Sequence, residues 1–281
     1  MVETEAFFRH GGEEVIVRLL AAIQIMLAPP SGQAVAEANG WIMQLTETAE
    51  CWPCTMAALQ RAPSDAVAHG LLSLCISLVR QAKLGNAPLP SDLAPFVKQM
   101  WSGATEASPA RRQACTLLCA LACVDGHECD RLLDWSLGLA EHDGTLHCLA
   151  LHVLQDLAFE VFHRPLQSKP LTKLLQDAQS DVISYLDACA TSDSLLLLAL
   201  QALQQWIHCG IVFSDLSSLP NLARGLVRGM SGGAAQLASE ILIDLISAVS
   251  PALTTNNNLT PSPTPTATPP SPSLLPSPST S

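Results

Sequence analysis

The chain has 281 residues, enough for one large or two small domains, and 48% of them are hydrophobic while only 14% are charged. Because soluble proteins carry about 25% charged residues on average, most segments of this chain must bury one face in a sizeable core. The 25 acidic and 14 basic residues give a net charge of −11, which disfavours nucleic acids and anionic membranes as partners and favours basic proteins.

No apolar stretch approaches the roughly 20 residues of a membrane span, so we expect no membrane insertion. Residues 1–12, an N-terminal arm, include acidic residues and lack the basic region and cleavage site of a secretory signal. We therefore expect the protein in the cytoplasm and nucleus. In that reducing environment the ten cysteines, which mostly follow helical apolar faces, are interpreted as small buried hydrophobic residues.

Helical periodicity appears from the first turns onward, and β-branched alternation and hairpin dipeptides are missing. Apolar residues recur at steps of three and four, as from Val15 to Met26 and from Leu71 to Val79. Ser31 and Ser64 are candidate N-caps, and Gly85 lies where a helix should stop. In the first half of the chain the pattern predicts helices at 13–27, 31–47, 50–61, 64–84, 91–101 and 108–124.

The same period continues in the second half of the chain. Ser108 followed by Pro109 is typical of a helix start, and Gly210 lies where a helix should end. We predict further helices at 127–140, 143–162, 171–190, 193–209, 214–229 and 232–249. The predicted fold class is therefore all-α.

The predicted helices form pairs that begin near residues 13, 50, 91, 127, 171 and 214. These spacings lie close to the HEAT or armadillo period of about 40–47 residues. Since one amphipathic pair cannot bury its face alone, stacking would create a continuous core and a curved inner surface for binding. We therefore predict a right-handed α-solenoid of about six HEAT- or ARM-like pairs over residues 13–250. A compact helical bundle is the alternative.

From residue 251 the composition changes to proline, serine and threonine without charge or apolar period. We expect residues 251–281 to be a disordered tail. Six Ser-Pro or Thr-Pro pairs could be phosphorylated by proline-directed kinases, although a simple spacer is the plainer interpretation. The serines and threonines of these pairs are Thr260, Ser262, Thr264, Thr268, Ser271 and Ser277.

The sequence "CWPC" raises the possibility of a redox site, because Cys51 and Cys54 have the spacing of a nucleophilic and a resolving thiol. A thioredoxin-like site requires a preceding strand, whereas an amphipathic helix is predicted before Cys51. Pro53 at an early helical position explains the local sequence without any chemistry. We favour the structural interpretation.

A second cysteine cluster lies in "CTLLCALACVDGHECD". Three of its cysteines follow one helical face over nearly three turns, which is too extended for one zinc ion. Cys123, His127 and Cys129 could converge around a turn, but they supply only three ligands. We interpret Cys115, Cys119 and Cys123 as core residues and expect no metal site.

Other chemical signatures are weak. His142, His147 and His152 are spaced by five residues, so they do not share one helical face. No phosphate-binding glycine loop, HExxH sequence or nucleophile elbow is present. We expect a binding protein without enzymatic activity and without a cofactor.

The order of several segments resembles the importin-β-type nuclear transport receptors, or karyopherins, especially their transportin-SR branch. Residues 36–60, "AEANGWIMQLTETAECWPCTMAALQ", are similar to the junction between the first two repeats, with Trp41 and Trp52 at its two characteristic tryptophan positions. Trp206 and Gly210 match the branch's "W-x-x-x-G" turn. Further similarity lies in residues 67–81, 110–123, 154–160 and 199–212, so the resemblance covers roughly residues 13–250.

The resemblance implies a HEAT solenoid whose second helices line a concave face. It also implies binding of the small GTPase Ran in its GTP form and of basic, often Arg/Ser-rich, cargo. Glu37 and Gln44 lie seven residues apart on one edge of the predicted first inner helix and are the candidate partner contacts. Trp41, Trp52 and Trp206 are expected to fill gaps between helices, and Gly210 to terminate one.

The chain departs from these receptors in length, since members of the family are about three times longer. It could be a truncated product or a fragment without autonomous transport activity. The alternative function is a helical-repeat scaffold regulated through its Ser/Thr-Pro tail. If no further pair follows the last one, its helices should expose an apolar face.

Overall fold

The structure, a computed structural model, describes residues 12–28, 32–85, 89–101, 108–124, 126–142, 146–162, 169–211 and 219–256. Within these residues the regular structure is entirely helical, which confirms the predicted all-α class. The helices are α2 (Gly12–Leu27), α3 (Gly32–Thr46), α4 (Cys51–Gln60), α5 (Asp65–Gly85), α6 (Leu93–Trp101), α7 (Pro109–Ala122), α8 (Gly126–His142), α9 (His147–Phe162), α10 (Lys169–Asp177), α11 (Gln179–Cys189), α12 (Asp193–Ile207), α14 (Pro220–Met230) and α15 (Ala235–Asn256). None of these helices is both long and apolar enough to span a membrane.

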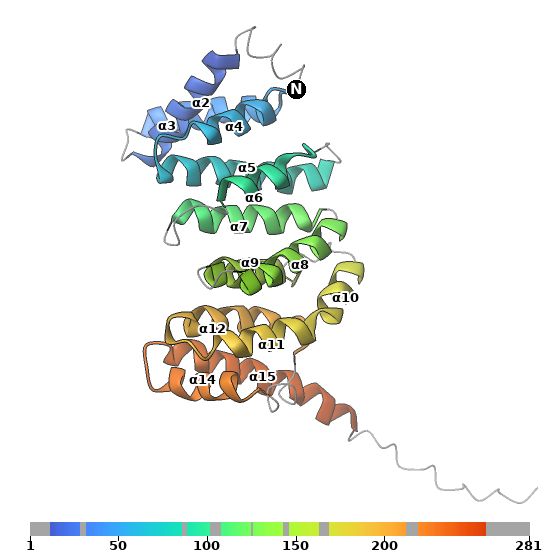
Figure 1. Ribbon diagram of the computed structural model, residues 1–281. Helices are drawn as coiled ribbons and strands as arrows, with labels where there is room; N and C mark the ends of the chain where they lie inside the picture. The colour runs from blue at the N-terminus through green and yellow to red at the C-terminus, as the bar shows by residue number, and fades with distance from the viewer. Residues whose placement is uncertain are drawn as a thin grey trace, which may run out of the picture.

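The helices stack in chain order, as Figure 1 shows. A second layer consists of α5, α7, α9, α12 and α15, and each of these helices contacts the next one. A first layer consists of α4, α6, α8, α11 and α14, and each of them packs against the second-layer helix that follows it in the chain. This order means that neighbouring segments in the sequence are also neighbours in space.

The N-terminal helices depart from this arrangement. α2 contacts α4 and α5, whereas α3 packs chiefly against α2. It is therefore α2, and not the second helix of the first predicted pair, that occupies the place next to α5. Glu37 and Gln44, both on α3, consequently lie outside the second layer.

Two predicted boundaries also change. The helix expected at 171–190 is divided at Ala178 into α10 and α11. Both halves contact α9, but α10 also packs against α8, whereas α11 packs against α12 and α14. α15 continues through Pro251 to Asn256, so the boundary expected at 250 falls inside a helix. The loss of apolar period at Ser250 thus precedes the end of helical hydrogen bonding. Residues 257–281 of the expected tail lie outside the described residues.

Local sequence signals account for several helix ends. The Ser108 hydroxyl accepts a hydrogen bond from the Arg111 amide at 3.2 Å, and Pro109 follows as the first helical residue, which confirms the predicted cap. Ser64 caps α5 by accepting from the Val67 amide at 3.3 Å. Gly210, just beyond α12, has a φ of 116°, a conformation that favours glycine. Ser31 lies outside the described residues.

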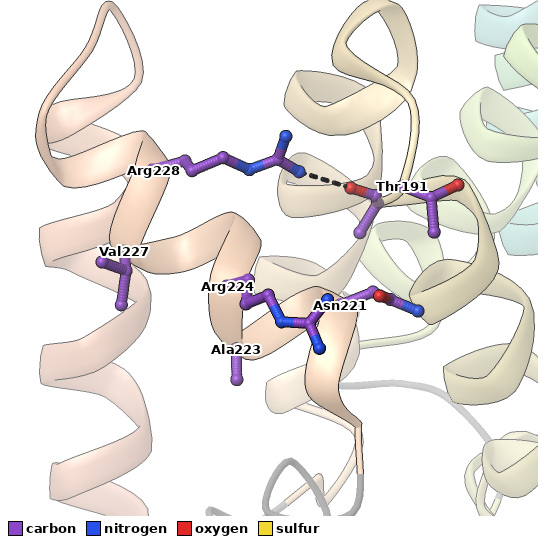
Figure 2. Close-up of a pocket in the computed structure, with 7 residues that line it drawn as sticks. Thr191, Asn221, Ala223, Arg224, Val227 and Arg228 are labelled. Carbon is purple, nitrogen blue, oxygen red and sulfur yellow. Dashed lines mark hydrogen bonds between the residues drawn. The ribbon is translucent and has the colours of Figure 1, made fainter.

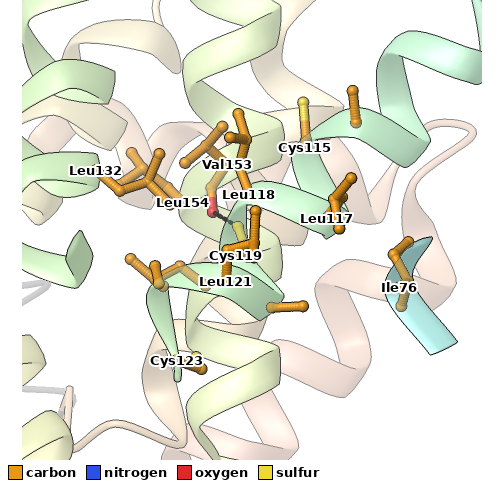
Figure 3. Packing of buried hydrophobic residues seen from close by; sticks show 14 of the residues in the cluster. Ile76, Cys115, Leu117, Leu118, Cys119, Leu121, Cys123, Leu132, Val153 and Leu154 are labelled. Carbon is orange, nitrogen blue, oxygen red and sulfur yellow. Dashed lines mark hydrogen bonds between the residues drawn. The ribbon is translucent and has the colours of Figure 1, made fainter. Parts of the chain in front are cut away.

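α7 is buried in the middle of the stack. This helix lies between α5 and α9 and buries small residues toward both, among them Ala114, Cys115 and Cys119. Figure 3 shows Cys115 and Cys119 among leucines of α7 and α9. The Cys119 thiol donates to the Val153 carbonyl at 3.4 Å. Since nine of the ten cysteines are buried and all are free, their interpretation as small hydrophobic residues is confirmed.

Trp206 is the largest fully buried side chain and joins α12 to α9. Its indole N–H donates to the Leu154 carbonyl at 2.9 Å, which satisfies the ring's polar atom inside the core. Trp41 and Trp52 are half-buried and pack against the edge of the core. The Arg18 guanidinium lies 4.7 Å from the centre of the Trp41 ring.

Candidate functional site

The cysteines of the CxxC sequence lie in the core rather than in an open site. α4 begins at Cys51, and the side chains of Cys51 and Cys54 are both buried. Burial raises the pKa of both thiols, that of Cys54 to about 11 with help from nearby Glu50. Because a redox nucleophile needs a stabilised thiolate, these environments disfavour the redox alternative.

The cysteines of the α7 region are core residues. Cys115, Cys119 and Cys123 are buried in the core along α7, and Cys129 is buried in α8. Burial raises the pKa of Cys115 to about 12. The side chain of His127 lies outside the described residues, and the described ones include no group of three potential metal ligands.

The three histidines spaced by five have separate surroundings. The His147 Nδ1 lies 2.8 Å from the Tyr185 hydroxyl, and their rings stack. His152 is half-buried on α9, and burial together with Arg112 and Arg111 lowers its pKa to about 4. The side chain of His142 lies outside the described residues. The structure therefore does not bring His147 and His152 together into one site.

The candidate partner contacts Glu37 and Gln44 are both exposed on α3. They flank the stripe that contains the buried residues Ala38 and Ile42, and Glu37 accepts a hydrogen bond from the Gln33 amide at 2.9 Å. Their exposure allows contact with a partner. They stay predictions, because exposure alone does not distinguish a contact from a solvated helix residue.

A broader candidate is the outward face of the second layer, hereafter the second-layer surface. Its members are partly or fully exposed residues that recur at steps of three and four on successive helices. The set comprises Ser73, Ser77 and Arg80 of α5, Arg112, Gln113 and Thr116 of α7, His152, Gln155, Phe159 and Phe162 of α9, Leu197, Gln201, Gln204 and His208 of α12, and Gln236 and Glu240 of α15.

Polar side chains connect the successive helices across this surface. The Gln113 amide donates to the Ser73 hydroxyl at 3.0 Å, which links α7 to α5. The Gln204 amide donates to Glu240 at 3.3 Å and links α12 to α15. Such links align neighbouring helices and leave the rest of each side chain available to solvent or a partner.

Two carboxylates lie beneath this surface, each covered by an arginine. Arg112 pairs with Asp156 at 2.5 Å, and the Thr116 hydroxyl donates to the same carboxylate at 2.6 Å. Arg80 pairs at 2.6 Å with Glu160, whose side chain is only 1% exposed. The exposed charge of this part of the surface is therefore carried by arginines.

Burial of Asp156 and its pairing with Arg112 shift the pKa of this carboxyl in opposite directions. Burial raises the pKa of this carboxyl above its ordinary value, while Arg112 and the Thr116 hydroxyl oppose the rise. The arginine thus compensates for a desolvated group instead of adding a surface ion pair. A role in holding α7 against α9 accounts for both features.

Aromatic side chains mark the centre of the second-layer surface. Phe159 and Phe162 of α9 are 45% and 50% exposed, and the Phe162 ring stacks on His208 of α12 at 4.8 Å. Exposed aromatic residues are enriched at protein–protein contacts. This makes the two phenylalanines the strongest candidate contacts on the surface.

Sequence reasoning missed both the phenylalanines and the buried pairs. His152, Gln155, Phe159 and Phe162 recur at steps of three and four, so a stripe opposite the apolar face of α9 could have been found. No comparable signal connects Arg112 with Asp156, because 44 residues separate them.

A scan against models of known protein families found no match, and a search of curated proteins also found none.

Proposed function

We propose that this chain is a protein-binding module of the helical-repeat type, with the right-handed arrangement of about six HEAT- or ARM-like helix pairs predicted from its period. The observation that carries this proposal is the ordered second layer, in which each helix contacts the next (Figure 1) and each carries partly or fully exposed side chains. A stack of this kind offers an extended area to a macromolecule.

Contacts between successive pairs support the repeat interpretation. Several polar contacts join residues 35 to 45 positions apart, close to the period of about 40–47 residues in HEAT and armadillo repeats. They are Asp65 with Ala110, Ser73 with Gln113, Thr116 with Asp156, Asp187 with Leu222, Asp193 with Arg228, and Gln204 with Glu240. Each of them links one pair to the following one.

The partners we propose are those implied by the resemblance: a Ran-type small GTPase, basic Arg/Ser-rich cargo, or both, in the cytoplasm and nucleus. The two would meet different parts of the molecule. On α5, α7 and α9 the second-layer surface presents arginines, amides and Phe159 with Phe162, which suit a folded protein partner. Basic cargo needs exposed carboxylates, and Glu37, Glu47 and Glu50 supply them on and just after α3.

Capture of Ran by the full chain tests the first partner. We expect Ran locked in its GTP form to be retained and the GDP form not. Replacing Phe159 and Phe162 together by alanine should weaken capture by about tenfold or more, as for contact residues at the centre of an interface. Met230→Ala removes a side chain of similar exposure from first-layer helix α14 and is the matched control. Equal or absent capture of the two nucleotide forms would contradict the proposal.

Binding of an Arg/Ser-rich peptide tests the second partner and the predicted contacts. The double variant Glu37→Gln, Gln44→Ala should weaken binding of this peptide and reduce its salt dependence. Asp134→Asn removes an exposed carboxylate on α8 and should leave binding unchanged. If the two variants behave alike, Glu37 and Gln44 are solvated helix residues without a binding role.

A further inference from the structure

A pocket of about 690 Å³ lies on the first-layer side, between the turn after α11 and helix α14 (Figure 2). Thr191 forms one wall, and Asn221, Arg224, Val227 and Arg228 of α14 form the other. The volume is within the range of pockets that hold small molecules or a few side chains. The pocket belongs neither to the second-layer surface nor to α3.

Arg228 is fixed in place at one end of the pocket. Its guanidinium pairs with Asp193 at 2.7 Å and donates to the Ala190 carbonyl at 2.8 Å, a contact visible in Figure 2. Asp193 is itself 89% exposed, so water competes with it for the Arg228 guanidinium. Arg228 therefore keeps part of its donor capacity toward the pocket.

Arg224, one helical turn earlier on α14, carries a positive charge without a paired carboxylate among the described residues. It is exposed, and no carboxylate of the described residues lies within ion-pair distance of it. Asp187 of α11 is already engaged, because it accepts hydrogen bonds from Asn221 and from the Leu222 amide at 2.8 Å. Arg18, Arg61, Arg80, Arg112 and Arg131, by contrast, each have an acidic or aromatic partner. In a chain of net charge −11, an arginine without such a partner is a distinctive feature.

Apolar side chains flank the two arginines on the same helix. Val227 is 69% exposed beside the pocket, and Met230, one turn further along α14, is 51% exposed. Exposed apolar area next to fixed cationic donors is typical of a protein-binding surface. A ligand that is only an anion would leave Val227 uncovered, so the site fits a ligand with both anionic and apolar groups.

We propose that this pocket binds an acidic segment of a partner protein in which carboxylates are adjacent to an apolar side chain. One carboxylate would accept two parallel hydrogen bonds from Arg224, and a second would share Arg228 with Asp193. The apolar side chain would cover Val227. This site is separate from the proposed GTPase and cargo surfaces, which call for other chemistry.

Fluorescence anisotropy with the full chain tests the proposal. The probe is a labelled peptide of alternating glutamate and leucine, compared with the same peptide carrying glutamine in place of glutamate. We expect only the acidic peptide to bind and its affinity to fall with rising salt. Arg224→Ala should weaken binding about tenfold or more, because a charge-assisted bidentate contact is lost. Val227→Ala should weaken it several-fold.

Arg131→Ala, which removes an exposed arginine of α8, is the matched control and should leave binding unchanged. Since Arg224 is exposed, its variant should also keep the wild-type unfolding midpoint, which separates lost contact from lost folding. Equal binding of the glutamine peptide, or unchanged binding by Arg224→Ala, would overturn the proposal. So would binding of a phosphorylated peptide of residues 257–281 without binding of the glutamate peptide.

Discussion

Apolar residues are buried at the α7–α9 interface, whereas several are exposed on the C-terminal helices α14 and α15. α7 has neighbours on two sides and buries almost all of its apolar residues, while the ion pair of its Arg112 with Asp156 of α9 holds a desolvated carboxylate. α15 packs against α12 and α14, and its Ile243 and Ile246 are 61% and 63% exposed. The difference shows that burial of a helix in this stack depends on how many neighbours it has more than on its own composition.

The largest effect should come from the tryptophan in the middle of the stack. Trp206→Ala removes a fully buried ring that joins α12 to α9, together with its hydrogen bond to Leu154. We expect the free energy of unfolding, measured by urea denaturation, to fall by roughly 3–5 kcal/mol. Trp41→Ala, which truncates a half-buried ring at the N-terminal edge, should cost clearly less. Equal costs would mean that the two regions pack with similar density.

Alanine substitutions of two isoleucines on α15 compare the stability cost on the buried and the exposed side of a single helix. Ile241 is fully buried, and its replacement by alanine should destabilise the protein by about 2–4 kcal/mol. Ile243→Ala should change stability by no more than about 0.5 kcal/mol, because the side chain already contacts water. Urea unfolding of both variants gives the measurement. A large cost at Ile243 would indicate that the C-terminal face is covered in solution.

The fold was predictable because its signals are local. Apolar residues at steps of three and four give most of the helices, and the caps at Ser64 and Ser108 fix two starts to within one residue. The position of α3 was not predictable, since α2 and α3 each have a helical period with one buried stripe. Which of the two contacts α5 depends on packing that neither helix encodes alone.

The candidate site was predictable only in part. Composition favours a protein-binding chain, and the exposure of Glu37 and Gln44 is compatible with their proposed role. The pocket beside Arg224 was not predictable, because one wall comes from the turn after α11 and the other from α14, and its charge depends on which carboxylates pair with which arginines. A pattern within one helix cannot show that Asp193 pairs with Arg228 while Arg224 has no such partner.

The ion pair in the middle of the stack should matter more than one on the surface. Arg112→Ala leaves the Asp156 carboxylate, within a side chain only 10% exposed, without its guanidinium. We expect a loss of about 1–3 kcal/mol in unfolding free energy. Arg131→Ala breaks an exposed pair with Glu128 on α8 and should cost less than about 0.5 kcal/mol. Similar losses in the two variants would show that Asp156 is well solvated.

The smallest effect concerns the pH dependence of the same interface. The pKa of His152 is lowered from 6.5 to about 4 in the folded protein, so folding favours the neutral imidazole. Its contribution to stability is complete above pH 6.5 and is lost as the pH falls through about 4. Asp156, whose pKa is raised, contributes in the opposite direction, because the folded protein binds its proton more readily.

Comparison of the wild-type protein with His152→Gln isolates the histidine. Glutamine keeps a neutral polar side chain at every pH, so its unfolding midpoint should fall less between pH 7 and pH 5 than that of the wild type. Urea denaturation at the two pH values measures the difference. If both proteins lose the same stability, the His152 imidazole is protonated in the folded state without penalty, and the α7–α9 interface is more open to water than its buried carboxylates indicate. The exposed C-terminal helices, which contain no histidine in α14 or α15, should contribute nothing to this difference.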